Sequence, residues 1–172
     1  RIVADIVRVH AARRPAHVAT VFAGEYTTYA QLDRYASQTA NGLIAEVGGG
    51  ARIAVLTANT SAFFELFFGA AKANCVLVPV NPRLAPTEVS HIVNDACAEM
   101  LFVGASLLDT VRSIRASLGT VNRIIALSDA PSDWESYRDW RDRQSMADPA
   151  LDIDPFDVAL QVYTSGTTGY PK

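Results

Sequence analysis

The sequence predicts an α/β fold, a layered arrangement in which a mainly parallel β-sheet is flanked by helices. Short, continuously apolar segments such as CVLVPV and RIIAL recur along the chain, and amphipathic stretches with helical spacing separate them. A strand that is apolar at every position is buried on both faces, which is typical of a parallel sheet covered by helices on each side. The chain has 172 residues. Because a domain contains roughly 150 residues on average, we expect one compact unit.

The N-terminal residues predict a helix followed by a hairpin. Apolar residues recur at helical spacing through residues 1–14, and Pro15 marks the expected end of the helix. Residues 18–22 and 26–28 lie on either side of a turn at Gly24. This pattern is typical of a short β-hairpin.

A long helix is expected to begin after the hairpin. Thr28 and Gln31 have the spacing of a capping box, in which each side chain accepts a hydrogen bond from the backbone N–H of the other residue. The three glycines at 48–50 are expected to end the helix. Its expected buried stripe consists of Leu32, Tyr35, Ala36, Thr39, Ala40, Leu43 and Ile44.

The next part of the chain alternates between strand and helix patterns, as repeated βαβ units do. Ser106 is the expected N-cap of the last of these helices. The expected strands are 53–56, 76–80, 100–103 and 124–127, and the expected helices are 61–73, 87–95 and 107–118.

The alternation breaks at residues 129–154, which contain several aspartates and prolines. We interpret them as an irregular surface connection with one short helix, in which Trp134, Tyr137 and Trp140 pack locally. Residues 157–163, DVALQVY, then predict a last strand.

Composition and charge exclude several classes of protein. Hydrophobic residues make up 49% of the chain and charged residues 19%, so the chain is expected to fold rather than remain disordered. The net charge of −3 argues against nucleic acid as a partner. Cys75 and Cys97 are expected to be buried, reduced thiols, because their spacing suits neither a disulfide framework nor a zinc site. The three histidines have no partners at ligand spacing and are assigned no role.

Nothing in the sequence predicts a membrane span. The most apolar stretch, 62–71, is interrupted by Glu65 and is shorter than the ~18 apolar residues that a spanning helix requires. The charged N-terminal residues do not have the layout of a signal peptide. We therefore expect a cytoplasmic protein without a transmembrane segment.

The nine residues after the last expected strand, TSGTTGYPK, combine hydroxyls, glycines and a lysine. Glycines let the backbone approach a ligand closely and turn successive N–H groups toward an anion. Hydroxyls add hydrogen-bond donors, and the lysine adds positive charge. The combination predicts a loop that binds polyphosphate.

The spacing separates this loop from three better-known motifs. A Walker A loop requires G-x-x-x-x-G-K-[ST], whereas here a tyrosine and a proline separate Gly169 from the lysine. The dinucleotide fingerprint G-x-G-x-x-G is absent, and the glycines at 48–50 precede a strand instead of a helix. Ser165 is not in a G-x-S-x-G nucleophile elbow, because Tyr163 occupies the position of the first glycine.

The segment YTSGTTGYPK resembles the phosphate-loop signature of the adenylate-forming, or AMP-binding, enzymes. Their N-terminal subdomain is also similar, in order and spacing, to TTYAQLDRYASQTANGL, RIAVLTANTSAFFELFFGAAKANCVLVPVNPRL and PTEVSHIVNDACAEMLFV. PVNPRLAPTEV looks more like the acyl-CoA synthetases, or fatty-acid–CoA ligases, than peptide-synthetase adenylation domains. By this resemblance, residues 1–172 are an N-terminal subdomain fragment that ends in the phosphate loop 163–172 and lacks the C-terminal lid domain.

The resemblance implies that the full protein activates a carboxylic acid, expected to be a fatty acid, with ATP and transfers it to coenzyme A. Mg²⁺ is the implied cofactor, and no catalytic protein nucleophile is required. The implied phosphate-binding groups are the loop backbone and the hydroxyls of Ser165, Thr167 and Thr168. Thr164 would also help to hold Mg²⁺, and Lys172 would lie beside the phosphates. Gly166 and Gly169 would let the loop move when pyrophosphate leaves.

Two alternatives remain open at this stage. The chain could be a non-catalytic α/β module that binds a nucleotide, or part of an acyl-AMP ligase that loads a carrier protein. By the resemblance, the adenine pocket, most of the acyl pocket and the lid with its catalytic lysine would lie beyond Lys172. We therefore expect the 172-residue fragment to be inactive alone.

Overall fold

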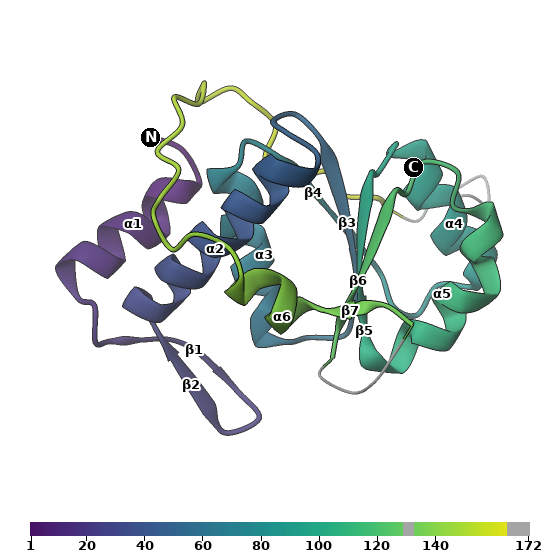
Figure 1. Ribbon diagram of the computed structural model, residues 1–172, viewed down its shortest axis with the longest axis horizontal. Helices are drawn as coiled ribbons and strands as arrows, with labels where there is room; N and C mark the ends of the chain where they lie inside the picture. Colours follow the sequence, from purple (N-terminus) through teal and green to yellow (C-terminus); the bar gives the residue numbers. More distant parts are fainter. Residues whose placement is uncertain (129–132, 165–172) are drawn as a thin grey trace.

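The computed structural model describes residues 1–128 and 133–164 (Figure 1). The helices are α1 (Ala4–Arg13), α2 (Tyr29–Glu46), α3 (Ser61–Lys72), α4 (Pro86–Asp95), α5 (Leu108–Ile114) and α6 (Tyr137–Asp142), with the 3₁₀ turns η1 (Ala105–Leu107) and η2 (Arg115–Ser117). The strands are β1 (Val18–Phe22), β2 (Glu25–Thr28), β3 (Arg52–Leu56), β4 (Val76–Val80), β5 (Met100–Gly104), β6 (Arg123–Leu127) and β7 (Glu135–Ser136).

Five strands form one sheet in the order β4-β3-β5-β6-β7, and every neighbouring pair is parallel. Helices α2, α3 and α6 cover one face of this sheet, and α4 and α5 cover the other (Figure 1). Successive residues of β3 show the division, since Ile53 and Val55 belong to the first core and Ala54 and Leu56 to the second. The predicted fold class is therefore confirmed.

The predicted start and end of α2 are also confirmed. The Thr28 hydroxyl accepts a hydrogen bond from the Gln31 N–H at 3.3 Å, and the Gln31 side chain accepts one from the Thr28 N–H at 2.8 Å. At the other end, Gly48 has a φ of +77° and its N–H donates to the Leu43 carbonyl. A left-handed glycine of this kind ends a helix.

Helix α2 is buried more widely than the predicted stripe. Gln38 and Gly42 are buried although they lie outside that stripe. The reason is that α6 and the residues after it pack against a further side of the helix. The Gln38 amide donates to the Gln144 carbonyl at 3.3 Å, and the Trp140 ring lies against Gly42.

Two local predictions were wrong. Ser106 does not cap the following helix but lies inside η1, because a 3₁₀ turn precedes α5 there. Cys97 is exposed, since its φ of +52° places it in the turn between α4 and β5. Cys75 is buried as predicted, and burial raises the pKa of its thiol to about 12.

The connection after β6 is not confined to the surface. Residues 135–136 add the parallel strand β7 to the sheet, and α6 places Tyr137 and Trp140 in the core with exposed fractions of 5% and 1%. Their rings pack edge-on against Phe102 of β5. The amphipathic pattern of six residues is too short to reveal this burial from sequence.

The predicted last strand, 157–163, is reduced to one parallel bridge between Leu77 and Leu160. Alternate apolar residues of this segment are exposed, among them Val158 at 61% and Val162 at 57%. β4 is its hydrogen-bonding neighbour among the described residues. An apolar strand requires partners and cover on more than one side to form a regular ladder.

Helices α2 and α3 approach closely at Gly69. A Cβ atom there would lie 2.6 Å from Cβ and Cγ2 of Thr39 and 3.2 Å from the Ala36 carbonyl oxygen. We expect Gly69→Ala to lower the free energy of unfolding by about 1–3 kcal/mol, the usual cost of overpacking a core. Gly119→Ala is the matched control for urea unfolding, because a Cβ there meets nothing within 4 Å. Equal stability of the two variants would contradict this prediction.

Candidate functional site

The expected phosphate loop begins at the end of the described chain. Thr164 is described and exposed. Ser165, Gly166, Thr167, Thr168, Gly169 and Lys172 lie outside the described residues. The structure therefore shows how the chain approaches the loop, through residues 144–164, which we call the strap.

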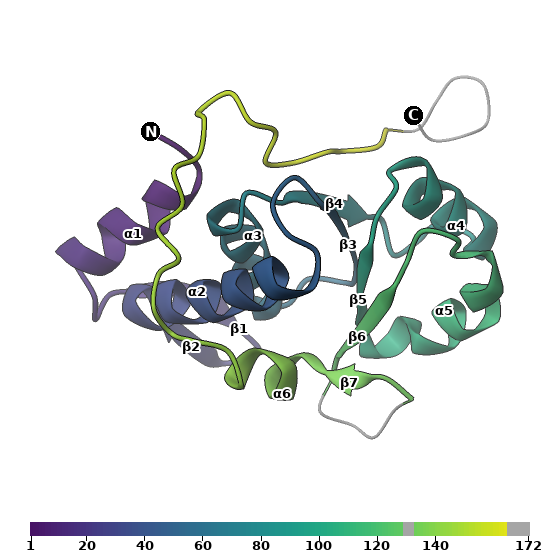
Figure 2. The same cartoon turned by 45° about the horizontal axis from the view of Figure 1, so that its top comes forward.

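The strap runs from α6 along α2, past α1 and back to the edge of the sheet beside β4 (Figure 2). It contains no helix, and its described pairing with the sheet is the bridge at Leu160. Polar side chains of the helices hold its first part. Asn41 donates from Nδ2 to the carbonyls of Ser145 and Ala147, both at 2.8 Å.

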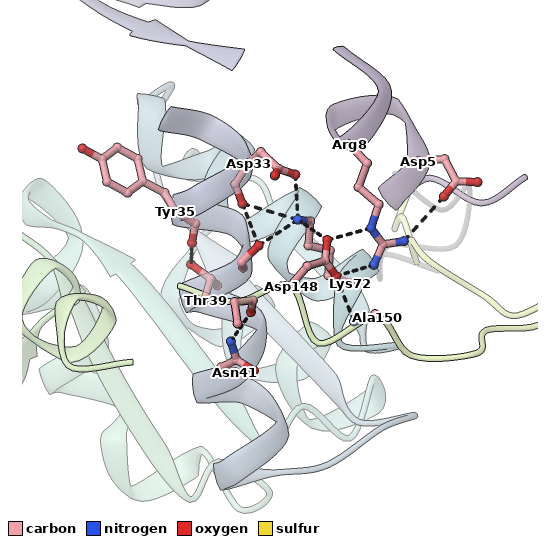
Figure 3. Close-up of polar contacts among 11 residues, drawn as sticks. Asp5, Arg8, Asp33, Tyr35, Thr39, Asn41, Lys72, Asp148 and Ala150 are labelled. Atoms are coloured by element: carbon pink, nitrogen blue, oxygen red, sulfur yellow. Dashed lines mark hydrogen bonds and ion pairs between the residues drawn. The ribbon is translucent and has the colours of Figure 1, made fainter. Parts of the chain in front are cut away.

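Lys72 forms the most buried of these anchors (Figure 3). Its side chain is 0% exposed, and its Nζ donates to the Asp33 carboxylate at 2.7 Å, the Ser37 hydroxyl at 2.8 Å and Asp148 Oδ2 at 2.8 Å. Arg8 of α1 holds the same Asp148 carboxylate through two hydrogen bonds, at 2.8 and 2.7 Å. One aspartate of the strap thus joins α1 and α3.

This pairing determines the charge of Asp148. The Arg8 guanidinium lowers the pKa of the Asp148 carboxyl well below its usual range, and Lys72 lowers it further against the opposing effect of burial. The carboxylate is therefore ionised near neutral pH, as an anchor between two cations requires.

A second buried pair lies near the carboxyl end of β6. Arg141 donates to the Glu65 carboxylate at 2.7 Å, and its guanidinium lies 3.9 Å from the centre of the Tyr35 ring. Burial lowers the pKa of Arg141, but Glu65 and Asp142 outweigh this effect and raise it above its ordinary value. A small hollow beside the pair is lined by Thr60, Ser61, Ala62, Glu65, Leu127, Ser128, Tyr137, Arg138 and Arg141. Neither Arg141 nor Glu65 lies in a motif, so nothing in the sequence indicates this ion pair.

The last part of the strap runs parallel to β4. The Leu77 N–H donates to the Ala159 carbonyl at 3.1 Å, and the Gln161 N–H donates to the Leu77 carbonyl at 2.9 Å. Because the bridge is parallel, the strap runs in the same direction as β4, toward the carboxyl end of that strand. Open parallel sheets bind ligands outside the carboxyl ends of their strands.

Tyr163 immediately precedes Thr164 and lies against the core beneath α4 and α5. Its hydroxyl donates to Asp95 Oδ2 at 2.5 Å and accepts a hydrogen bond from Gln161 Nε2 at 3.0 Å. Burial, and then the Asp95 carboxylate, raise the pKa of Tyr163 to about 12. The phenol is therefore a neutral donor near neutral pH.

The described residues contain no group of three His, Cys, Asp or Glu side chains that could hold a metal ion. Mg²⁺ is commonly bound by one or two protein groups together with the phosphates of a substrate. A hydroxyl at Thr164 is compatible with that mode of binding. Among the residues that the structure describes, no helix is long and apolar enough to cross a bilayer.

The open parallel sheet, and the strap that runs beside β4 toward the carboxyl ends of the strands, define an α/β protein with an expected ligand site at that end of the sheet. The chain belongs to the AMP-binding enzyme family, whose model matches residues 7–172.

Relatives in this family are ligases. The chain is 36% identical to the fatty acid–[acyl-carrier-protein] ligase ScoC of Streptomyces coeruleorubidus, over 95% of this chain and 30% of that protein. It is 38% identical to the long-chain-fatty-acid–CoA ligase FadD13 of Mycobacterium tuberculosis, over 84% of this chain and 28% of that protein. The chain therefore spans about three tenths of the length of these relatives.

Solved structures confirm the N-terminal subdomain architecture. The anthranilate CoA ligase AuaEII in complex with anthranoyl-AMP matches 99% of this chain and 33% of its own, with a TM-score of 0.94 and 28% identity. The inhibitor-bound N-terminal domain of FACL13 from Mycobacterium tuberculosis matches 100% of this chain and 43% of its own, with a TM-score of 0.90 and 34% identity.

Proposed function

We propose that this chain is the N-terminal subdomain fragment of a longer ligase that activates a fatty acid with ATP and transfers the acyl group to coenzyme A. A carboxylate oxygen of the acid attacks the α-phosphorus of ATP, the bond from that phosphorus to the bridging oxygen breaks, and pyrophosphate leaves. The thiol of coenzyme A then attacks the acyl carbon, AMP leaves, and the thiol proton passes to solvent. The observation that carries the proposal is the sequence TSGTTGYPK at the end of the strap, in a chain that the family model matches over residues 7–172.

The proposed loop acts by positioning and charge compensation rather than by covalent chemistry. Backbone N–H groups and hydroxyls would hold the β- and γ-phosphates, so that the α-phosphorus faces the carboxylate. Lys172 would compensate the negative charge that develops on the leaving pyrophosphate. The proposed nucleotide-binding residues are Thr164, Ser165, Gly166, Thr167, Thr168, Gly169 and Lys172.

Magnesium is proposed as the metal of this site, with Thr164 as the ligand from this chain. When bound, Mg²⁺ would reduce the charge repulsion between the phosphates and the attacking carboxylate. The strap would keep Thr164 beside the edge of the sheet.

A carrier protein is the second candidate acceptor. The observation that favours it is the 36% identity to ScoC, which is named as a fatty acid–[acyl-carrier-protein] ligase. Both acceptors present a thiol to the same acyl-adenylate, so the first half-reaction is common to them. A non-catalytic nucleotide-binding module would bind ATP without either half-reaction.

Pyrophosphate exchange into ATP tests the first half-reaction. We expect the full-length protein to exchange radiolabelled pyrophosphate in the presence of one class of acid from a panel of short, medium, long-chain and aromatic acids. Addition of coenzyme A should then yield a thioester, whereas an acyl-AMP ligase would transfer only to a carrier protein. The 172-residue fragment should show no exchange, because the relatives are about three times as long. ATP binding without exchange by the full-length protein would support the non-catalytic module instead.

A further inference from the structure

Tyr163 connects the strap to two other elements, and it lies directly before the sequence TSGTTGYPK. Its hydroxyl reaches Asp95 at the end of α4, 68 residues earlier in the chain. The Gln161 side chain donates from Nε2 to the same hydroxyl, while its amide oxygen Oε1 accepts a hydrogen bond at 3.0 Å from Nε of Arg52 at the start of β3. A continuous hydrogen-bonded chain therefore runs from β3 through the strap to α4.

The backbone of the strap is held to β4 at Ala159 and Gln161. Beyond Gln161, the Tyr163 phenol ties the strap to α4. The hydrogen bond from this phenol ends on a carboxylate, and charge-assisted bonds are stronger than neutral ones. The bond therefore restrains the chain where a sequence rich in glycine and hydroxyls begins.

We propose that Tyr163, held by Asp95 and Gln161, is a positioning residue that sets where the phosphate loop leaves the sheet. This inference rests on the proposed function. Each residue that becomes ordered on binding loses about 1–2 kcal/mol of backbone entropy. Fixing the first end of the loop in the free protein reduces the part of that cost which ATP binding must offset.

The test compares ATP binding and turnover in the full-length protein and its Tyr163→Phe variant. Phenylalanine keeps the ring packed against the core but removes the hydroxyl. We expect the Kd for ATP and the KM for ATP to rise about threefold to tenfold, the size of effect that losing one ordinary hydrogen bond has, because the phenol acts on ATP through the loop and not directly. The kcat should change less than twofold, because the hydrogen bonds of the Tyr163 hydroxyl are made to Asp95 and Gln161 and not to the phosphates on which charge develops.

Two further variants separate positioning from general stability. Asp95→Ala removes the acceptor and should raise the Kd as Tyr163→Phe does, whereas Asp95→Asn keeps an acceptor oxygen and should recover most of the affinity. The double variant Tyr163→Phe/Asp95→Ala should be no weaker than either single variant. Tyr26→Phe is the matched control, since Tyr26 is 66% exposed on the hairpin. The melting temperatures of all variants should agree within about 3 °C, since these groups lie at the edge of the fold.

The outcomes distinguish the two proposals. An unchanged Kd in Tyr163→Phe, or a loss of affinity that follows a loss of melting temperature, overturns the positioning role. Wild-type protein that binds ATP without pyrophosphate exchange overturns the proposed function, and the Kd comparison still decides the role of Tyr163. Wild-type protein that binds no ATP overturns both.

Discussion

Replacing Lys72 with methionine is expected to lower the free energy of unfolding by about 3–5 kcal/mol, the cost of removing one partner from a buried ion pair. The Lys72 side chain is 0% exposed, and its ammonium group is shared by Asp33 and Asp148. Methionine fills much of the same volume but leaves both carboxylates facing an apolar group. Arg8 would still hold Asp148, so the larger loss of interaction is expected at Asp33.

Urea unfolding of the wild type and of Lys72→Met under identical conditions measures the difference in their free energies of unfolding. Arg112→Met is the control, because Arg112 also pairs with two aspartates, Asp109 and Asp133, but is exposed on α5. Exposed pairs contribute about 0–1 kcal/mol, so the control should remain close to the wild type. A Lys72→Met variant within 1 kcal/mol of the control would show that the anchor contributes little to stability.

The effect of Lys72→Met should depend on pH. The pKa of Asp148 is lowered in the folded state, so the stability it contributes is present above its unfolded pKa of about 3.9 and is lost as the pH falls toward the folded value. The difference in unfolding free energy between the wild type and Lys72→Met should therefore be largest near pH 7. It should narrow as the pH falls from about 4 toward the folded pKa of Asp148, and only by the part of the lowering that Lys72 causes, because Arg8 still holds the carboxylate in the variant. Unfolding curves at pH 7, 5 and 3 would show a smaller difference at pH 3 than at pH 5.

The regular elements of this fold were predictable because their signals are local. The capping box at Thr28 and Gln31, the glycine at 48 and the apolar strands each depend on residues within a few positions of one another. The parallel sheet follows from strands that are apolar on both faces. Such features require no knowledge of distant contacts.

The course of the strap could not be predicted, because distant polar residues determine it. Asn41 and Gln38 occupy helix positions that a periodicity argument assigns to solvent, yet they donate to backbone carbonyls more than a hundred residues later in the chain. Lys72 similarly resembles the basic residue that commonly ends an exposed helix. Nothing in its neighbourhood indicates that aspartates from two other segments surround it.

The candidate site divides in the same way. The residue types of the phosphate loop follow one another in nine positions, so sequence alone could propose them. The hydrogen bond from Tyr163 to Asp95 joins residues that are 68 positions apart in the chain, so it becomes visible only in three dimensions. Residues that are neighbours in the sequence thus predict the chemistry of the loop, whereas contacts between distant residues determine where the loop begins in the fold.

Removing the positive charge of Lys172 is expected to have the largest effect on turnover. In the full-length protein, Lys172→Met should lower kcat/KM for ATP by about tenfold to a hundredfold, since a charge that compensates a leaving group in the transition state contributes about that much or more. The loss should include kcat, in contrast to Tyr163→Phe, because negative charge on the pyrophosphate oxygens grows as the bond to the α-phosphorus breaks.

Lys172→Arg keeps the charge and should retain more activity than Lys172→Met, although its planar, forked head differs from a compact ammonium group. Lys72→Met is the matched control for Lys172→Met, because it makes the same substitution at a lysine 100 positions away in the core. Pyrophosphate exchange at several ATP concentrations would separate these two variants, since Lys72→Met should lower the free energy of unfolding but change kcat little. A Lys172→Met variant with kcat unchanged would mean that this lysine contributes to ATP binding but not to the departure of pyrophosphate.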